Sequence, residues 1–256
     1  MMDSAVTGRT NNMAHTHLII GAGGAIGRAV AEALAAREPQ SRVFAVARQH
    51  QQSFEADNVT AITLGSANEK AVNQWTAEQK ARGIVFSTVI CTAGVLHGDA
   101  GGTAVSPEKK IEDISADKLL AYFSVNTVVP AIWLKALVNV LDKERSTIAC
   151  LSARVGSISD NRLGGWYGYR ASKAALNMML KTAAAEFSRR SKNTVLISYH
   201  PGTVDSALSE PFQGNVPEGK LFTPAFTASQ LLDFIDKATP ENNPHFIDWA
   251  HKPVPW

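Results

Sequence analysis

This sequence contains few cysteines and almost no excess of one charge. Its 256 residues include two cysteines, Cys91 and Cys150, which lack the spacing of a metal-binding or disulfide framework. Lys plus Arg total 25 against 23 for Asp plus Glu, a net charge of +2, and a nucleic-acid surface usually has a clear basic excess. We therefore expect no metal, no nucleic-acid partner and a reducing, cytoplasmic setting.

Long hydrophobic runs are also missing. No stretch has about 20 uninterrupted apolar residues, the length that crosses a membrane, and the most apolar helical region, 128–141, contains Lys135 and Asn139. The first residues are polar and lack the apolar core of a signal peptide. The sequence therefore predicts no membrane segment, with a disordered tail over residues 1–13 and one domain over residues 14–256.

Short apolar runs alternate with longer helical periods along the chain. This pattern is typical of an α/β fold with a doubly wound, mostly parallel sheet of about seven strands and helices on both faces. Several runs are apolar without alternation, as expected of strands buried on both sides. The predicted strands are His17–Ile20, Val43–Ala47, Ala61–Leu64, Thr88–Cys91, Thr147–Leu151, Val195–Tyr199 and Phe246–Asp248.

The segments between these strands carry helical periodicity. Pro130 should end, kink or split the long region 117–141, because proline lacks the amide hydrogen that a helix interior needs. A Pro- and Gly-containing segment, 206–227, reads as a lid over the substrate. The predicted helices are Ala25–Ala36, Asn68–Ala81, Asp117–Leu141, Tyr169–Arg190 and Ala228–Lys237.

A glycine-rich turn follows the first predicted strand and opens the first predicted helix. Glycine lets the backbone approach a pyrophosphate, and the helix N-terminus supplies free N–H groups to it. Tight strand-to-helix turns also use glycine for shape alone, but the position at the first strand favours a dinucleotide site. We assign the phosphate-binding role to Gly21, Gly23, Gly24, Ala25, Ile26 and Gly27.

Arg48 ends the second predicted strand, where a Rossmann fold that binds NAD has an acidic residue. A guanidinium pairs with a 2′-phosphate, so this position favours NADP(H) over NAD(H). A solvated surface arginine is the alternative interpretation.

Tyr169 and Lys173 lie four residues apart and so share one face of the strongest predicted helix. A lysine ammonium beside a phenol favours the phenolate and lowers its pKa. A tyrosine with such a pKa can exchange a proton with a substrate oxygen. The spacing alone is common on helix surfaces, so its meaning depends on the other motifs.

In this order of motifs the sequence resembles the short-chain dehydrogenase/reductase family, and more narrowly its C-factor-like, carbonyl-reductase-type branch. The resemblance rests on the glycine loop, Cys91-Thr92-Ala93-Gly94, Asn126 in Val-Asn-x-x-x-Pro, Tyr169-x-x-x-Lys173 and Pro201-Gly202-Thr203-Val204. It implies hydride transfer between a nicotinamide cofactor and a carbonyl or alcohol substrate, and a homodimer or homotetramer. It also implies catalytic roles for Asn126, Tyr169 and Lys173, and cofactor contacts for Tyr169, Lys173, Ala93, Gly94, Pro201, Gly202 and Val204.

One departure from the family pattern concerns the serine that binds the substrate oxygen. The family has a Ser-Ser pair after the fifth strand, and this sequence has Ser152-Ala153. Ser152 is our candidate for the missing role, while Ser157 and the absence of any hydroxyl are the alternatives. The same substitution motivates a second hypothesis, a cofactor-binding signalling or regulatory protein with little catalysis.

Overall fold

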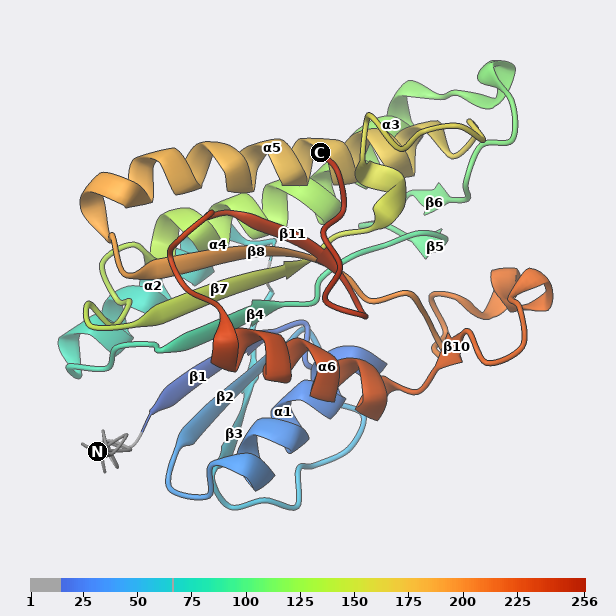
Figure 1. Ribbon diagram of the computed structural model, residues 1–256. Helices are drawn as coiled ribbons and strands as arrows, with labels where there is room; N and C mark the ends of the chain where they lie inside the picture. Colours follow the sequence, from blue (N-terminus) through green and yellow to red (C-terminus); the bar gives the residue numbers. More distant parts are fainter. Residues whose placement is uncertain (1–14, 66) are drawn as a thin grey trace, which may run out of the picture.

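The computed structural model describes residues 15–65 and 67–256, so the predicted tail over residues 1–13 lies outside the described residues. Seven parallel strands form one sheet in the order β3-β2-β1-β4-β7-β8-β11 (Figure 1). The strands are β1 (Thr16–Ile20), β2 (Arg42–Ala47), β3 (Val59–Thr63), β4 (Thr88–Cys91), β7 (Ser146–Leu151), β8 (Thr194–His200) and β11 (His245–Asp248). All seven predicted strands are present, with small shifts at their ends.

Helices cover both faces of this sheet (Figure 1). One face carries α1 (Ala25–Arg37) and α6 (Pro224–Lys237), and the other carries α2 (Glu69–Ala81), α3 (Ala116–Phe123), α4 (Val129–Leu137) and α5 (Tyr167–Arg190). Alternate residues of β1 point into opposite layers, since Ile19 packs in the α1 and α6 core while Leu18 and Ile20 pack in the other. The predicted single-domain, doubly wound fold is confirmed.

The long predicted helix is split, as its proline indicated. A π-helical turn, Ser124–Val128, joins α3 to α4 directly ahead of Pro130, and its extra residue brings Asn126 fully into the interior. The continuous segment Ala116–Leu137 is long and apolar enough, by length and composition, to cross a membrane. In this fold it packs as a core helix with Trp133 and Leu137 buried against the sheet, so the expectation of no membrane segment stays a prediction.

Two loops project beyond the carboxyl ends of the strands (Figure 1). The first contains a small hairpin, β5 (Gly98–Asp99) and β6 (Ala104–Val105). The second, the predicted lid, contains a 3-10 helix, Glu210–Asn215, and a short parallel pair of β9 (Thr203–Val204) with β10 (Leu221–Phe222). Two-residue strands have no periodicity that a sequence reading can detect.

Candidate active site

The glycine loop folds tightly between β1 and α1. A Cβ on Gly27 would lie 2.4 Å from the Gly21 carbonyl oxygen, and one on Gly21, whose φ is +91°, would lie 2.6 Å from Thr92 Oγ1. Gly23 is equally constrained by the Gln49 carbonyl oxygen at 2.7 Å, whereas Gly24 has no neighbour nearer than 3.5 Å. Only glycine therefore fits three of the four positions.

The first turn of α1 has the features of an anion site. Gly24 is the N-cap and provides no side-chain hydrogen bond, and the turn contains no acidic residue. The loop from Gly23 to Ala25 is exposed. Free N–H groups at the positive end of a helix dipole therefore face outward, as a phosphate requires.

Arg48 follows β2 at the edge of this loop, next to the Ala47 and Gln49 that enclose Gly23. Its side chain is exposed, and among the described residues it makes no hydrogen bond or ion pair. Arg28, by contrast, is held by Glu32 at 2.8 Å and by the backbone oxygens of residues 52 and 53. Arg48 is thus a free cation beside the predicted phosphate site.

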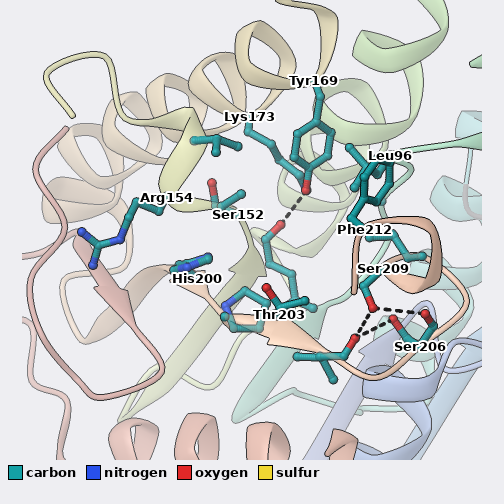
Figure 2. Close-up of a pocket in the computed structure, with 18 of the residues that line it drawn as sticks. Leu96, Ser152, Arg154, Tyr169, Lys173, His200, Thr203, Ser206, Ser209 and Phe212 are labelled. Atoms are coloured by element: carbon teal, nitrogen blue, oxygen red, sulfur yellow. Dashed lines mark hydrogen bonds between the residues drawn. The ribbon is translucent and has the colours of Figure 1, made fainter. Parts of the chain in front are cut away.

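A cavity of about 510 Å³ opens next to the glycine loop. Its lining includes Ile26 of the glycine loop, and Figure 2 shows Tyr169, Lys173 and Ser152 on the same side of the cavity. The sequence-predicted residues in its wall are Ile26, Ala93, Gly94, Ser152, Tyr169, Lys173, Pro201, Gly202 and Val204. Strand ends far apart in the sequence thus meet at one carboxyl edge of the sheet, where ligands bind in doubly wound folds.

Tyr169 and Lys173 occupy the buried face of the first turns of α5. The Lys173 Nζ donates to the Leu151 carbonyl oxygen at 2.8 Å and lies 5.8 Å from the centre of the Tyr169 ring. Burial lowers the pKa of Lys173 to about 8 and raises the pKa of Tyr169 above its ordinary value of 10. The predicted lowering of the Tyr169 pKa is therefore wrong for this arrangement, because burial disfavours the charged phenolate.

Asn126 is completely buried and links the π-helical turn to the loop after β4. Its Oδ1 accepts the Val95 amide at 2.8 Å, while its Nδ2 donates to the Val95 carbonyl at 3.0 Å and to Ser172 Oγ at 3.0 Å. Gly94 lies against this group, since a Cβ there would be 3.3 Å from Lys173 Nζ and 3.5 Å from Asn126 Oδ1. Asn126 therefore fixes the spacing between the loop after β4 and α5.

The segment after β7 contains the three residues considered for the substrate-binding hydroxyl. Ala153 packs in the small cluster that contains Tyr169, so a methyl group stands at the expected serine position. Ser152 lines the cavity, but its hydroxyl donates to Asn177 Oδ1 at 2.7 Å. Ser157 is buried and accepts the Asp160 amide at 3.1 Å, and it does not belong to the described cavity wall.

Ser152 is part of a buried network that sequence reasoning missed. Asn177 Oδ1 also accepts the Ser198 hydroxyl at 2.6 Å, and its Nδ2 donates to the Gly156 carbonyl at 3.3 Å. Ser152 directly follows β7, Asn177 lies on α5 and Ser198 lies on β8, and the two hydrogen bonds span 25 and 21 residues of sequence. No spacing signal in the sequence indicates such a contact.

A second missed residue, Glu108, supports the start of α5. Its Oε2 accepts the Gly168 amide at 3.1 Å and its backbone oxygen accepts the Trp166 amide at 2.6 Å. Trp166, the N-cap, has a left-handed backbone (φ 55°, ψ 40°) and no capping side chain of its own. The carboxylate of Glu108 therefore caps the helix that positions Tyr169, which is where a negative charge is favoured.

The predicted lid contributes apolar side chains to the cavity. Phe212 lies in the wall with its ring 5.2 Å from that of Trp166 and 5.8 Å from that of His97. The His97 Nε2 hydrogen bonds to the Ala207 carbonyl at 2.9 Å. Leu96, Trp166, Leu208 and Phe212 form an apolar part of the cavity wall, and Tyr167 lies outside the described wall.

The charged groups near the cavity are neutralised or uncharged. Arg154 is paired with Asp248 at 2.9 Å and with Asp160 at 3.3 Å. Burial and the nearby Arg154 lower the pKa of His200 to about 4, so its imidazole is neutral at physiological pH. Its Nδ1 is buried and has no hydrogen-bond partner among the described residues. Among the described residues that line the cavity, Lys173 is thus the one cation without an acidic partner.

The two cysteines lie opposite each other on neighbouring strands, since Cys91 of β4 pairs in register with Cys150 of β7. Both are free thiols and fully buried. A hydrogen bond with Cys91, together with burial, raises the pKa of Cys150. They form part of the hydrophobic core beneath the site.

Comparison with known proteins agrees with this geometry. A model of the family described as short chain dehydrogenase matches residues 15–216. The chain is 30% identical to 1-hydroxy-2-glutathionyl-2-methyl-3-butene dehydrogenase of Rhodococcus sp. (strain AD45), covering 70% of this chain and 72% of that one. It is 29% identical to C-signal of Myxococcus xanthus, covering 67% and 98%.

Solved structures show the same fold. Carbonyl reductase Sniffer of D. melanogaster superposes with a TM-score of 0.80 at 22% identity, over 95% of this chain and all of that one. An NADPH-bound carbonyl reductase from chicken fatty liver gives a TM-score of 0.79 at 21% identity, over 95% and 99%. With the family match over most of its length, the chain belongs to the short-chain dehydrogenase/reductase family and is an oxidoreductase of that family.

Proposed function

We propose that this protein is an NADPH-preferring reductase of uncharged, apolar carbonyl compounds, with Tyr169 as the proton donor. The residues present fit a nicotinamide dinucleotide: the glycine loop leaves no room for a Cβ at Gly21, Gly23 or Gly27, and the free start of α1 is exposed beside it. When bound, the reduced cofactor supplies a hydride to the carbonyl carbon. Pro201, Gly202 and Val204 would bound its nicotinamide end, with Ala93 and Gly94 opposite.

The proton chemistry belongs to Tyr169, and this is the observation that carries the proposal. Burial keeps its pKa above 10, so the phenol holds its proton at physiological pH. A protonated phenol in the cavity can donate to the oxygen of a carbonyl as negative charge develops there. The phenolate left after this donation is also the base for the reverse oxidation, so burial imposes the same cost on both directions.

Lys173 and Asn126 support the chemistry of the Tyr169 phenol in different ways. The Lys173 Nζ reaches the cavity and would contact the hydroxyls of the nicotinamide ribose. Asn126 hydrogen bonds to the backbone of Val95 and to Ser172 of α5. Ser172 in turn hydrogen bonds to the Tyr169 carbonyl, so Asn126 fixes the position of the turn of α5 that carries Tyr169 and Lys173. We propose both as members of the catalytic group.

Ser152 stays our candidate for a second hydrogen-bond donor to the substrate oxygen. It lines the cavity, but its single proton is held by Asn177. To donate to the substrate oxygen, the Ser152 hydroxyl must therefore rotate out of its hydrogen bond with Asn177. The alternative, a reductase that works with Tyr169 alone, has the methyl group of Ala153 in its favour.

The lining of the cavity supports the substrate class. Leu96, Trp166 and Phe212 form an apolar wall, and the charge of Arg154 is balanced by two carboxylates. A carboxylate substrate would find no free arginine there, whereas an aromatic or aliphatic ketone or aldehyde gains contact with the rings. The lid over residues 206–227 would close this wall.

Replacement of Tyr169 by Phe tests the central claim. We expect oxidation of NADPH by a panel of aromatic and aliphatic aldehydes and ketones to fall by about 10²–10⁴-fold, with cofactor affinity nearly unchanged. Tyr167→Phe, a neighbouring tyrosine outside the cavity wall, is the matched control. A wild-type protein that binds NADPH but reduces nothing in the panel would favour a regulatory role instead.

Cofactor preference is tested separately at Arg48. We expect Arg48→Ala to weaken NADPH binding by at least tenfold while NADH binding changes little, because only NADPH carries the 2′-phosphate. Arg42→Ala, at the opposite end of β2, should change neither. Equal weakening of both cofactors in Arg48→Ala would contradict the preference.

A further inference from the structure

Two histidines and a glutamate come together at the end of the sheet opposite the active site. His15 and His17 are separated by one residue at the start of β1, so their side chains share a face of the strand. That face packs against α1, as Ile19 of the same strand shows. Glu38, the C-cap of α1, meets both rings there.

The donor atoms already lie close to the arrangement of a metal site. His15 Nδ1 is 2.9 Å and His17 Nε2 is 3.2 Å from the same carboxylate oxygen, Oε2 of Glu38, and all three atoms lie within 4.8 Å of one another. Ligand atoms on a tetrahedral zinc, at bond lengths of about 2.0–2.2 Å, are separated by about 3.3 Å. Small side-chain shifts would bring the three atoms to one ion.

We propose that His15, His17 and Glu38 form a three-ligand site for Zn²⁺, with water as the fourth ligand. Two imidazoles and one carboxylate suit zinc and its neighbours in the first transition row, and they do not suit Mg²⁺ or Ca²⁺, which prefer oxygen ligands. The ion takes the ring lone pair of each histidine, so the proton of each ring resides on its other nitrogen. Glu38 lies 21 residues beyond His17, so no ligand spacing in the sequence indicates this group.

Burial and access both favour this site. The side chain of His17 is 2% exposed, that of Glu38 36% and that of His15 51%, so one ligand is fixed in the core and the others face solvent. The group borders a wide cavity at the amino-terminal edge of the sheet, which gives an ion a path of entry. Because that edge is opposite the cofactor edge, the ion would join the start of β1 to the end of α1 and would not take part in hydride transfer.

The test uses the full chain after removal of metal with a chelator. Co²⁺, a coloured substitute for Zn²⁺, should bind at one ion per chain with the visible absorption of a tetrahedral site, and Zn²⁺ should displace it. Micromolar Zn²⁺ should also raise the thermal unfolding midpoint, since an ion that binds only the folded chain stabilises it. Failure of the wild-type chain to bind either ion would overturn the proposal and leave only a hydrogen-bonded His–Glu cluster.

Variants locate the ion. His15→Gln alters a half-exposed side chain that the fold does not need, and Glu38→Gln keeps the shape of its residue, so each should fold and lose at least tenfold in Co²⁺ affinity. The matched control, His50→Gln with His245→Gln, removes two histidines remote from the cluster and should bind as the wild type does. Equal affinity in all of these proteins would show that the ion binds elsewhere and would overturn the proposal.

Discussion

Asn126 and Val95 hold each other by two reciprocal hydrogen bonds, from the Val95 amide to Oδ1 at 2.8 Å and from Nδ2 to the Val95 carbonyl at 3.0 Å. One side chain thereby satisfies both backbone groups of a residue in the loop after β4, as a neighbouring strand would. The extra residue of the π-helical turn makes this reach possible, because it brings the Asn126 side chain into the interior. The side-chain amide of Asn126 therefore joins the π-helical turn between α3 and α4 to the loop after β4, at the carboxyl edge of the sheet.

Removal of that amide should weaken the fold as well as the site. Asn126→Ala leaves the Val95 amide and carbonyl buried without partners, at about 1–3 kcal/mol for each group. We expect the free energy of unfolding in urea to fall by about 2–4 kcal/mol. Asn161→Ala, in an exposed loop, should change it by less than about 0.5 kcal/mol. A loss of activity at unchanged stability would contradict the structural part of this role.

Two glycines of the same loop, Gly24 and Gly27, should respond differently to an added methyl group. Gly27→Ala places a Cβ within 2.4 Å of the rigid Gly21 carbonyl oxygen, so the loop must open. Gly24→Ala meets nothing nearer than 3.5 Å. We expect the first variant to lower the thermal midpoint of unfolding by several degrees and the second to leave it nearly unchanged. Equal midpoints would show that the loop tolerates a side chain at Gly27.

Much of the fold was predictable because hydrophobic periodicity reflects burial directly. All seven strands of the sheet were predicted, and Pro130 marked the place where the long helix divides. The ends of elements were less accurate, since α6 begins at Pro224 and not at Ala228, and Pro224 can open a helix as well as end one. The hairpin of β5 and β6 was not predicted, because two residues cannot show a period.

The site was predictable where a motif is local and unpredictable where it depends on distant contacts. Tyr169 and Lys173 are one helical turn apart, so their shared face follows from the sequence. The partner of Ser152 does not, since Asn177 comes from another element and only packing brings the two together. The pKa of Tyr169 was predicted in the wrong direction because the extent of its burial is a property of the folded chain.

The serine position offers a test that can increase activity. Ala153→Ser restores a hydroxyl beside Tyr169, and one donor aimed at a developing oxyanion contributes about 2.7–4 kcal/mol. If Tyr169 works without a second donor, kcat for carbonyl reduction should rise by about 10-fold or more in this variant. If Ser152 already serves the substrate, Ser152→Ala should lower kcat, and Ala153→Ser should add little. If Ser152 only supports Asn177, Ser152→Ala should lower the unfolding midpoint with kcat unchanged, as measured by steady-state kinetics beside thermal melts.

Lys173 links stability to pH in the direction opposite to that of a lysine whose pKa is raised by an acidic partner. Its pKa is about 8 in the folded chain, against 10.5 for a free side chain, so between these values the unfolded chain binds more protons. Stability from this group therefore rises with pH across the window from about 8 to 10.5. Below that window the buried cation costs about 3 kcal/mol, at about 1.4 kcal/mol for each unit of pKa shift.

Lys173→Met removes this cost along with the ammonium to which we assign a catalytic role, although the Leu151 carbonyl loses its donor. We expect the variant to be inactive and, at about pH 7, close in stability to the wild type, since the lost hydrogen bond offsets the relieved desolvation. Urea unfolding at several pH values should then show the wild type gaining stability relative to the variant above pH 8. Parallel curves for the two proteins would mean that Lys173 is not desolvated in the folded chain, and the placement of its ammonium in the buried wall would then be wrong.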